Sequence, residues 1–117
     1  MPHSNLYTLW RTFLVSVCLG ASLARAEILM VFSSDWCGNC VKFKQDLEHN
    51  PFALEQYVVE VLDFDADKES AKQLKVTRIP TFIIYDDEHR EVARKVGYVN
   101  ISELKAWAQK HNAKLNK

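Results

Sequence analysis

The sequence of 117 residues predicts a single α/β domain, with a mixed four-stranded sheet and helices on both faces. Apolar runs typical of strands alternate with segments in which apolar residues recur at helical spacing. Two later runs are separated only by a polar turn, which indicates a hairpin, and an amphipathic helix follows them. Strand–helix alternation gives parallel pairing, whereas a hairpin is antiparallel, so the predicted sheet is mixed.

The first half of the predicted domain has two strands and one helix. Residues 28–32 form a continuous apolar run, which suits a strand buried on both faces. A helix is expected over residues 38–49, because Val41, Phe43 and Leu47 recur at helical spacing and Asn50-Pro51 ends it. The run YVVEVLDF at residues 57–64 predicts a second buried strand.

The second half begins with residues 68–74, which are mostly polar and predict one or two helical turns. Strands are expected at residues 81–85 and 91–96, joined by the polar turn 86–89. Asn100 stands three residues before Glu103, as in a capping box, and predicts the start of the last helix.

The first 26 residues differ in composition from the rest. They contain Arg11 and Arg25 but no Asp or Glu, and residues 12–24 form an apolar run of 13 residues. Ala24-Arg25-Ala26 then provides an A-x-A site. This order predicts a secretory signal peptide, residues 1–26, ahead of a domain at residues 27–117. An uncleaved membrane anchor is the alternative, although a membrane span needs about 20 apolar residues.

The charge balance gives no support for a nucleic-acid partner, and cleavage of the predicted signal peptide would leave one pair of cysteines in an exported protein. The 15 Lys and Arg residues balance 15 Asp and Glu residues, so no basic excess exists to neutralise phosphates. Removal of residues 1–26 also removes Cys18 and leaves Cys37 and Cys40 as the only cysteines. In an oxidising compartment these two can pair only with each other or with another molecule. We expect a monomer in the periplasm, with ordinary secretion as the alternative.

Cys37 and Cys40 are separated by Gly38 and Asn39 across the first turn of the expected helix. Residues three apart lie on the same side of a helix, so the two sulfur atoms can reach disulfide distance. The first sulfur lies near unpaired N–H groups and the positive end of the helix dipole, which favour the attacking thiolate. Cys40 is placed to attack a mixed disulfide formed by Cys37, and Gly38 lets another protein approach closely.

Three other interpretations of this pair are open. A structural zinc site needs four ligands, and His49, His89 and His111 have no paired ligand spacing, so we assign no metal residues. Two thiolates alone could bind Cu(I). A structural disulfide across three residues would close a very short loop and add little stability.

Residues 36–40, WCGNC, follow a predicted buried strand and resemble the active site of the thioredoxin superfamily, whose best-known form is WCGPC. Residues 76–81, VTRIPT, resemble the family's segment that carries a cis-proline, and residues 95–97, KVG, resemble its C-terminal end. Together with the predicted signal peptide, the resemblance extends to small periplasmic thioredoxin-like proteins. These include the C-terminal thioredoxin-like domain of the membrane reductase that feeds electrons to the periplasm.

The resemblance implies that Cys37 is the nucleophile and Cys40 the resolving thiol. It implies no cofactor other than the redox-active disulfide between them. Gly38 and Asn39 would contribute to the substrate-binding surface.

The resemblance also implies a surface beside the cysteines. Trp36 would form an apolar lip, Pro80 would be cis, and the backbone of Ile79 would pair with an extended substrate segment. Without the resemblance, Trp36 would be interpreted as a core aromatic residue and Pro80 as a trans proline that begins an edge strand.

The sequence departs from the family pattern at three places. The family's buried Asp, six residues before the first cysteine, is Val31 here, and its Lys partner corresponds to Val61, so two buried hydrophobic residues are expected. The dipeptide between the cysteines lacks the family's proline. The family's first strand and helix are missing, which leaves one sheet edge less covered.

We therefore predict a protein-disulfide oxidoreductase that reduces disulfides or relays electrons to other exported proteins. Its electron donor would be a membrane or soluble thiol reductant. An oxidase or isomerase of protein disulfides is one alternative, and a Cu(I) carrier that uses the same thiolates is another. A third is a redox-inert adaptor that holds partners in the groove at Ile79 and Pro80.

Overall fold

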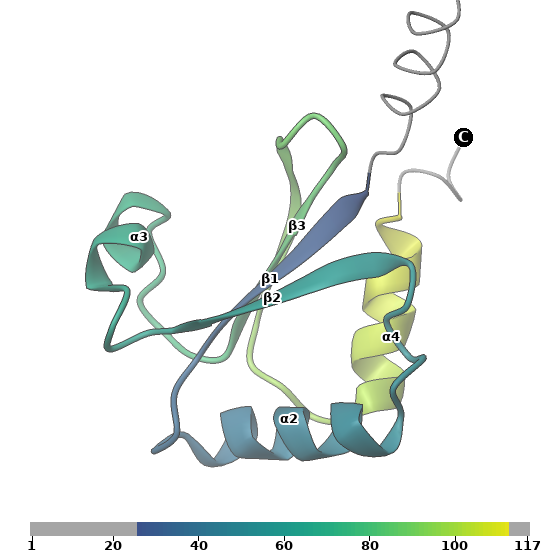
Figure 1. Ribbon diagram of the computed structural model, residues 1–117, viewed down its shortest axis with the longest axis horizontal. Helices are drawn as coiled ribbons and strands as arrows, with labels where there is room; N and C mark the ends of the chain where they lie inside the picture. Colours follow the sequence, from purple (N-terminus) through teal and green to yellow (C-terminus); the bar gives the residue numbers. More distant parts are fainter. Residues whose placement is uncertain (1–25, 113–117) are drawn as a thin grey trace, which may run out of the picture.

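The computed structural model describes residues 26–112, in which helices cover both faces of a four-stranded sheet (Figure 1). Residues 1–25 of the predicted signal peptide lie outside this range. None of the helices in residues 26–112 is long and apolar enough to cross a membrane.

The elements begin and end within one residue of their predicted bounds. In chain order they are β1 (Glu27–Ser33), α2 (Gly38–His49), β2 (Tyr57–Asp63), α3 (Lys68–Gln73), β3 (Thr81–Tyr85), β4 (Glu91–Val96) and α4 (Ile101–Lys110). The strand order is β2-β1-β3-β4. β1 is parallel to β2 and antiparallel to β3, and β3 is antiparallel to β4. The predicted mixed sheet with helices on both faces is confirmed.

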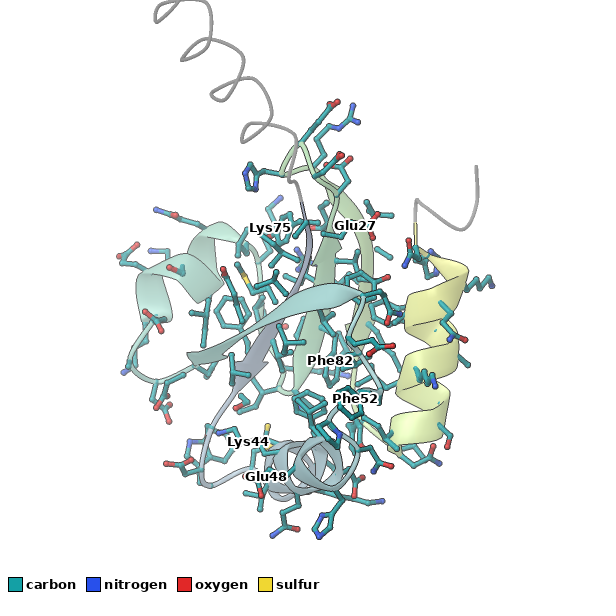
Figure 2. All side chains as sticks on the ribbon, turned by 45° about the vertical axis from the view of Figure 1, so that its right-hand side comes forward. Glu27, Lys44, Glu48, Phe52, Lys75 and Phe82 are labelled. Carbon is teal, nitrogen blue, oxygen red and sulfur yellow. The ribbon has the colours of Figure 1, made fainter. Side chains whose placement is uncertain are left out.

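The larger hydrophobic core lies between the sheet and the helices α2 and α4. Phe43 of α2 packs edge-on against Phe82 of β3 and Tyr98, with ring centroids 5.1 and 5.5 Å apart. Phe82 is labelled in Figure 2, between the sheet and α2. Ten buried residues form this cluster: Leu29, Val31, Phe43, Leu54, Tyr57, Phe82, Ile84, Tyr98, Leu104 and Ala108. This packing fixes α2, which carries both cysteines, against the sheet.

The smaller core lies on the opposite face of the sheet, under α3. Its buried members are Phe32, Ala71, Val76 and Ile83. Met30, Leu62, Phe64, Leu74, Ile79 and Tyr85 pack against them while partly exposed. Because side chains alternate along a strand, neighbouring residues of β1 and β3 supply the two cores.

The strand β2 lies at the edge of the sheet, so the prediction of a second buried strand at residues 57–64 is wrong. Val58 is 48% exposed and Val61 is 43% exposed. Val31 is fully buried, as expected, but its register partner Val61 is not. A run of β-branched residues fits an edge strand as well as an inner one, and only strand pairing distinguishes the two. Within the described residues β2 pairs with β1 alone, which agrees with the expected less-covered edge.

Candidate active site

Cys37 is the N-cap residue of α2. Its backbone is extended (φ −91°, ψ 113°), and its Sγ accepts a hydrogen bond from the backbone N–H of Cys40 at 3.3 Å. Ser, Thr, Asp or Asn usually fill this place with a side-chain oxygen. Here the sulfur fills it, at the helix end where backbone N–H groups and the dipole stabilise negative charge. The arrangement suits a sulfur that reacts as a thiolate.

Cys40 lies one turn further along α2 and is fully buried, whereas Cys37 is partly exposed. Both cysteines are free thiols. Burial, with a smaller contribution from the hydrogen bond to Cys37, raises the pKa of the Cys40 thiol to about 12. The two thiols therefore differ in access, and burial opposes ionisation of the Cys40 thiol. Only Cys37 can meet another protein first.

Gly38 and Asn39, between the two cysteines, are exposed at the first turn of α2. A Cβ atom added at Gly38 would meet no other atom within 4 Å, and only Gly97 among the described glycines has a positive φ. Neither the backbone nor the interior therefore requires glycine at position 38. The open space beside Cys37 lies on the outside of the protein.

Trp36 lies at the surface beside Cys37, with 68% of the residue exposed. Its indole Nε1–H donates to Oδ2 of Asp65 at 2.6 Å. Asp65 lies in the turn after β2, where its own N–H donates to Oδ1 of Asp63 at 2.8 Å. The interpretation of Trp36 as a core aromatic residue does not hold. The indole is instead fixed at the surface by a charge-assisted hydrogen bond.

Ile79 and Pro80 lie across from Cys37, at the start of β3. The Ile79–Pro80 peptide bond is cis. The Sγ–H of Cys37 donates to the carbonyl oxygen of Ile79, with 3.9 Å between sulfur and oxygen. The carbonyl of Pro80 accepts from the N–H of Gly97 at 2.8 Å, and the hydroxyl of Thr81 donates to the carbonyl of Arg78 at 2.5 Å. The fold thus brings Cys40 and the carbonyl of Ile79 to the sulfur of Cys37, and the other candidate residues adjoin these three in the chain.

The position of the family's buried Asp is apolar in this protein. Val31 is fully buried in the larger core. Asp35, the acidic residue nearest to Cys37 in the sequence, has a side chain that is 97% exposed and lies 3.6 Å from Nζ of Lys44. The Asp35 carboxylate therefore belongs to the solvated surface and not to the interior beneath Cys40.

The segment after β4 is attached to α2 by side chains that sequence reasoning missed. The hydroxyl of Tyr98 donates to Oδ2 of Asp46 at 2.5 Å, and Nζ of Lys42 donates to the carbonyl of Val99 at 2.7 Å. Burial, followed by this bond to Asp46, raises the pKa of the Tyr98 hydroxyl. No sequence signal links residues 52 positions apart, so these bonds could be found only in the folded chain.

Within residues 26–112, no group of three or more His, Cys, Asp and Glu side chains is arranged to hold a metal ion. His49 ends α2, His89 lies in the turn between β3 and β4, and His111 follows α4. The cysteine pair is thus the chemically distinctive feature of the described residues.

Residues 21–112 match the family model of the thioredoxin-like domain. The chain belongs to the thioredoxin family. It is 34% identical to the thioredoxin of Chlamydia muridarum over 90 residues, which cover 77% of this chain and 87% of that protein. The thioredoxin of Chlamydia trachomatis is 32% identical over the same shares. Membership of this family makes the protein a thiol–disulfide oxidoreductase, and Cys37 and Cys40 are the cysteine pair of its described residues.

Solved structures agree with the fold of this thioredoxin-like protein. The thioredoxin of Fasciola hepatica has a TM-score of 0.65 and 28% sequence identity, covering 74% of this chain and 82% of its own. A malaria parasite thioredoxin-2 has a TM-score of 0.66 over 77% of this chain and 87% of its own. At 22% identity this second likeness shows the fold alone.

Proposed function

We propose that this thioredoxin-like protein is an exported reductant that passes electrons to disulfides of other exported proteins. The observation that carries the proposal is the asymmetry of the cysteine pair. Cys37 is accessible at the helix N-terminus, whereas Cys40 is fully buried and its pKa is raised to about 12. Such a pair attacks with one sulfur and resolves with the other.

The reaction consists of two thiol–disulfide exchanges. The Cys37 thiolate attacks one sulfur of a substrate disulfide, so that the S–S bond breaks, a mixed disulfide forms and one substrate thiolate leaves. Cys40 then gives its proton to the released substrate thiolate or to water, and its sulfur attacks Sγ of Cys37. The second substrate thiolate leaves, and the Cys37–Cys40 disulfide forms. Two electrons pass to the substrate, and a membrane or soluble thiol reductant restores the two thiols.

The substrate would bind as an extended segment beside Cys37. The carbonyl of Ile79 faces Cys37 Sγ, and the exposed ring of Trp36 provides apolar surface next to it. Gly38 and Asn39 leave this approach open. A strand-like segment paired with the backbone at Ile79 would gain main-chain hydrogen bonds, which recognise many sequences, so we expect several protein substrates.

Export is supported by the composition of residues 1–26, which combine basic residues, an apolar run and an A-x-A site. We place the protein in the periplasm. N-terminal sequencing of the protein from fractions of the native host tests this: Glu27 as the first residue in the periplasmic fraction is the expected result. Recovery of the intact chain from the cytoplasm would contradict export. The likeness to the C-terminal domain of the periplasmic membrane reductase stays a prediction.

Two cysteine variants test the chemistry. Cys37→Ser should abolish reduction of a protein disulfide, because no accessible attacking sulfur remains. Cys40→Ser should instead accumulate mixed disulfides in the native host, since the resolving sulfur is missing, and mass spectrometry of the trapped species would identify the substrates. Full activity of Cys37→Ser would overturn the proposal.

The direction of electron flow is tested by titrating the Cys37–Cys40 pair against a glutathione redox buffer. A potential between about −200 and −270 mV, the range of glutaredoxins and thioredoxin, indicates a reductant. A potential near −120 mV, typical of a strong oxidant of protein thiols, would overturn reduction as the physiological direction.

A further inference from the structure

One arginine holds the segment that leads into the substrate-facing residues. Arg94 lies in β4, and its Nη1–H donates to the carbonyl of Leu74 at 2.7 Å and to that of Lys75 at 3.4 Å. Its Nε and Nη2 donate to the two carboxylate oxygens of Glu91 at 3.2 and 2.8 Å. The two bonds to Glu91 fix the orientation of the guanidinium group, so that Nη1 points to the loop carbonyls.

The loop that Arg94 contacts needs such support, because α3 ends in a turn that glycine usually makes. Lys75 has a φ of 57°, in the left-handed region, and its N–H donates to the carbonyl of Lys72 at 3.1 Å. The N–H of Val76 donates to the carbonyl of Ala71 at 2.8 Å. These two bonds define a Schellman motif with lysine at the position where glycine is preferred. Lys75 is labelled in Figure 2.

Arg94 therefore compensates for two features of this turn. Carbonyl groups at the end of a helix lack intrahelical partners, and the arginine supplies a donor to those of Leu74 and Lys75. A side chain in the left-handed region also raises the energy of the turn, which this bonding offsets. Glycine at position 75 would adopt this positive φ without the energy cost of a side chain.

The strand β4 and the residue after it anchor both ends of the segment between α3 and β3. Arg94 holds the beginning, at Leu74 and Lys75, and the N–H of Gly97 holds the end, at the carbonyl of Pro80. Between these anchors Val76 and Ile79 pack in the smaller core. Ile79 is four residues from Lys75, and its carbonyl lies 3.9 Å from Sγ of Cys37.

We propose that Arg94 is a positioning residue for protein substrates. It acts through the loop of residues 74–79, which it holds so that the backbone of Ile79 meets an extended substrate segment next to Cys37. The inference rests on the proposed function, because it assumes that substrates bind at Ile79. It predicts a large effect on the binding of protein substrates and only a small one on the reactivity of Cys37, whose Sγ is 3.9 Å from the Ile79 carbonyl.

The test compares Arg94→Ala with Arg90→Ala. Arg90 is the control. It is also an arginine paired with carboxylates, those of Asp86 and Glu88 at 3.0 and 3.1 Å, but it lies at the β3–β4 turn and its side chain is 71% exposed. The measurements are kcat and KM for reduction of a protein disulfide, and the rate of Cys37 alkylation by iodoacetamide. Arg94→Ala should raise KM about tenfold, as expected for the loss of one charge-assisted anchor, with kcat and alkylation within about twofold of wild type. Arg90→Ala should change none of them.

Two further variants separate positioning from general destabilisation. Arg94→Lys should raise KM only about threefold, because an ammonium group can still donate to the Leu74 carbonyl but not as a planar fork to Glu91 as well. Adding Lys75→Gly to Arg94→Ala should recover part of the lost affinity, because glycine adopts this φ without strain. If Arg94→Ala does not fold, as judged by circular dichroism, Arg94→Lys decides the question.

The role of Arg94 would be overturned by an unchanged KM in folded Arg94→Ala. A fall in the alkylation rate of Arg94→Ala as large as its rise in KM would also overturn this role. So would a rise in KM of the same size in Arg90→Ala. A wild-type protein that reduces no protein disulfide would contradict the proposed function itself, which is a different result.

Discussion

The two faces of the sheet hold different parts of the active site by different means. The face under α2 and α4 carries the cysteines, and ten buried residues pack there. The face under α3 carries the loop with Ile79, where four buried residues pack. On that side hydrogen bonds from Arg94 and Gly97 supplement the smaller core. The reacting sulfur atoms are thus held mainly by packing, and the substrate-facing backbone to a larger extent by polar contacts.

This difference suits the chemistry. Cys40 must remain dry and close to Cys37, which dense packing provides. The surface that meets substrates must accept several extended chains, and a loop held by a few bonds can adjust where a packed core cannot.

The largest expected effect comes from two neighbouring isoleucines of β3 that are both fully buried. Ile84 lies in the larger core and Ile83 in the smaller one. Ile84→Ala should lower the free energy of unfolding by about 3–5 kcal/mol, because the dense packing around it relaxes little. Ile83→Ala should cost about 2–3 kcal/mol, since the short helix α3 can move toward the cavity. Urea unfolding of both variants measures this, and equal losses would contradict the difference between the faces.

A smaller effect is expected from the pH dependence of stability. The pKa of Cys40 is raised from 9.0 to about 12 in the folded state, so the folded protein binds a proton that the unfolded chain releases. Stability of the reduced protein is therefore complete below pH 9 and falls between pH 9 and 12, by at most about 1.4 kcal/mol per pH unit from this group. Oxidised protein has no Cys40 thiol and should lack this component.

Other buried groups also ionise at alkaline pH, so the contribution of Cys40 must be isolated by comparing reduced with oxidised protein. Burial raises the pKa of Tyr57 from 10.0 to about 12, which also lowers stability at alkaline pH but in both redox states. The measurement is the difference in unfolding free energy between oxidised and reduced protein from pH 8 to pH 11. A difference that stays constant over this range would show that Cys40 is not buried as a neutral thiol.

The smallest effect is expected at the surface, where Asp65 orients Trp36. Asp65→Asn keeps an acceptor but removes the charge from the 2.6 Å bond to the indole, so KM for a protein disulfide should rise about threefold. Stability should change by less than about 0.5 kcal/mol, as for other exposed polar substitutions. Asp67→Asn is the control, since Asp67 caps α3 without a side-chain hydrogen bond. Equal effects of the two substitutions would exclude a specific role for Asp65.

The candidate site shows how far local sequence reasoning reaches. Cys37 and Cys40 could be assigned from their spacing and from the helix that follows, because both depend on neighbours in the chain. Asp65 and Arg94 could not, since their partners lie 29 and 20 residues away. A weak signal for Asp65 exists: it follows β2, and parallel strands place their carboxyl ends at the same edge of the sheet, next to Trp36 after β1.

The edge position of β2 shows the same limit. A valine-rich run has the same sequence pattern in an edge strand as in an inner strand. Val58 and Val61 are exposed because β2 pairs with only one described strand, β1. Expected bounds, in contrast, were correct to within one residue for every element. Hydrophobic periodicity, capping residues and helix-ending residues act over three or four positions, so they can be recognised in the sequence.

The sequence alone therefore determined the order of strands and helices, the hairpin, and the cysteine pair at the start of a helix, because each depends on residues close together in the chain. Tertiary structure decided which strand is exposed, how deeply Cys40 is buried, and which side chains hold Trp36 and the loop before Ile79. These depend on contacts between distant segments, whose partners are chosen only when the whole sheet and its two cores assemble.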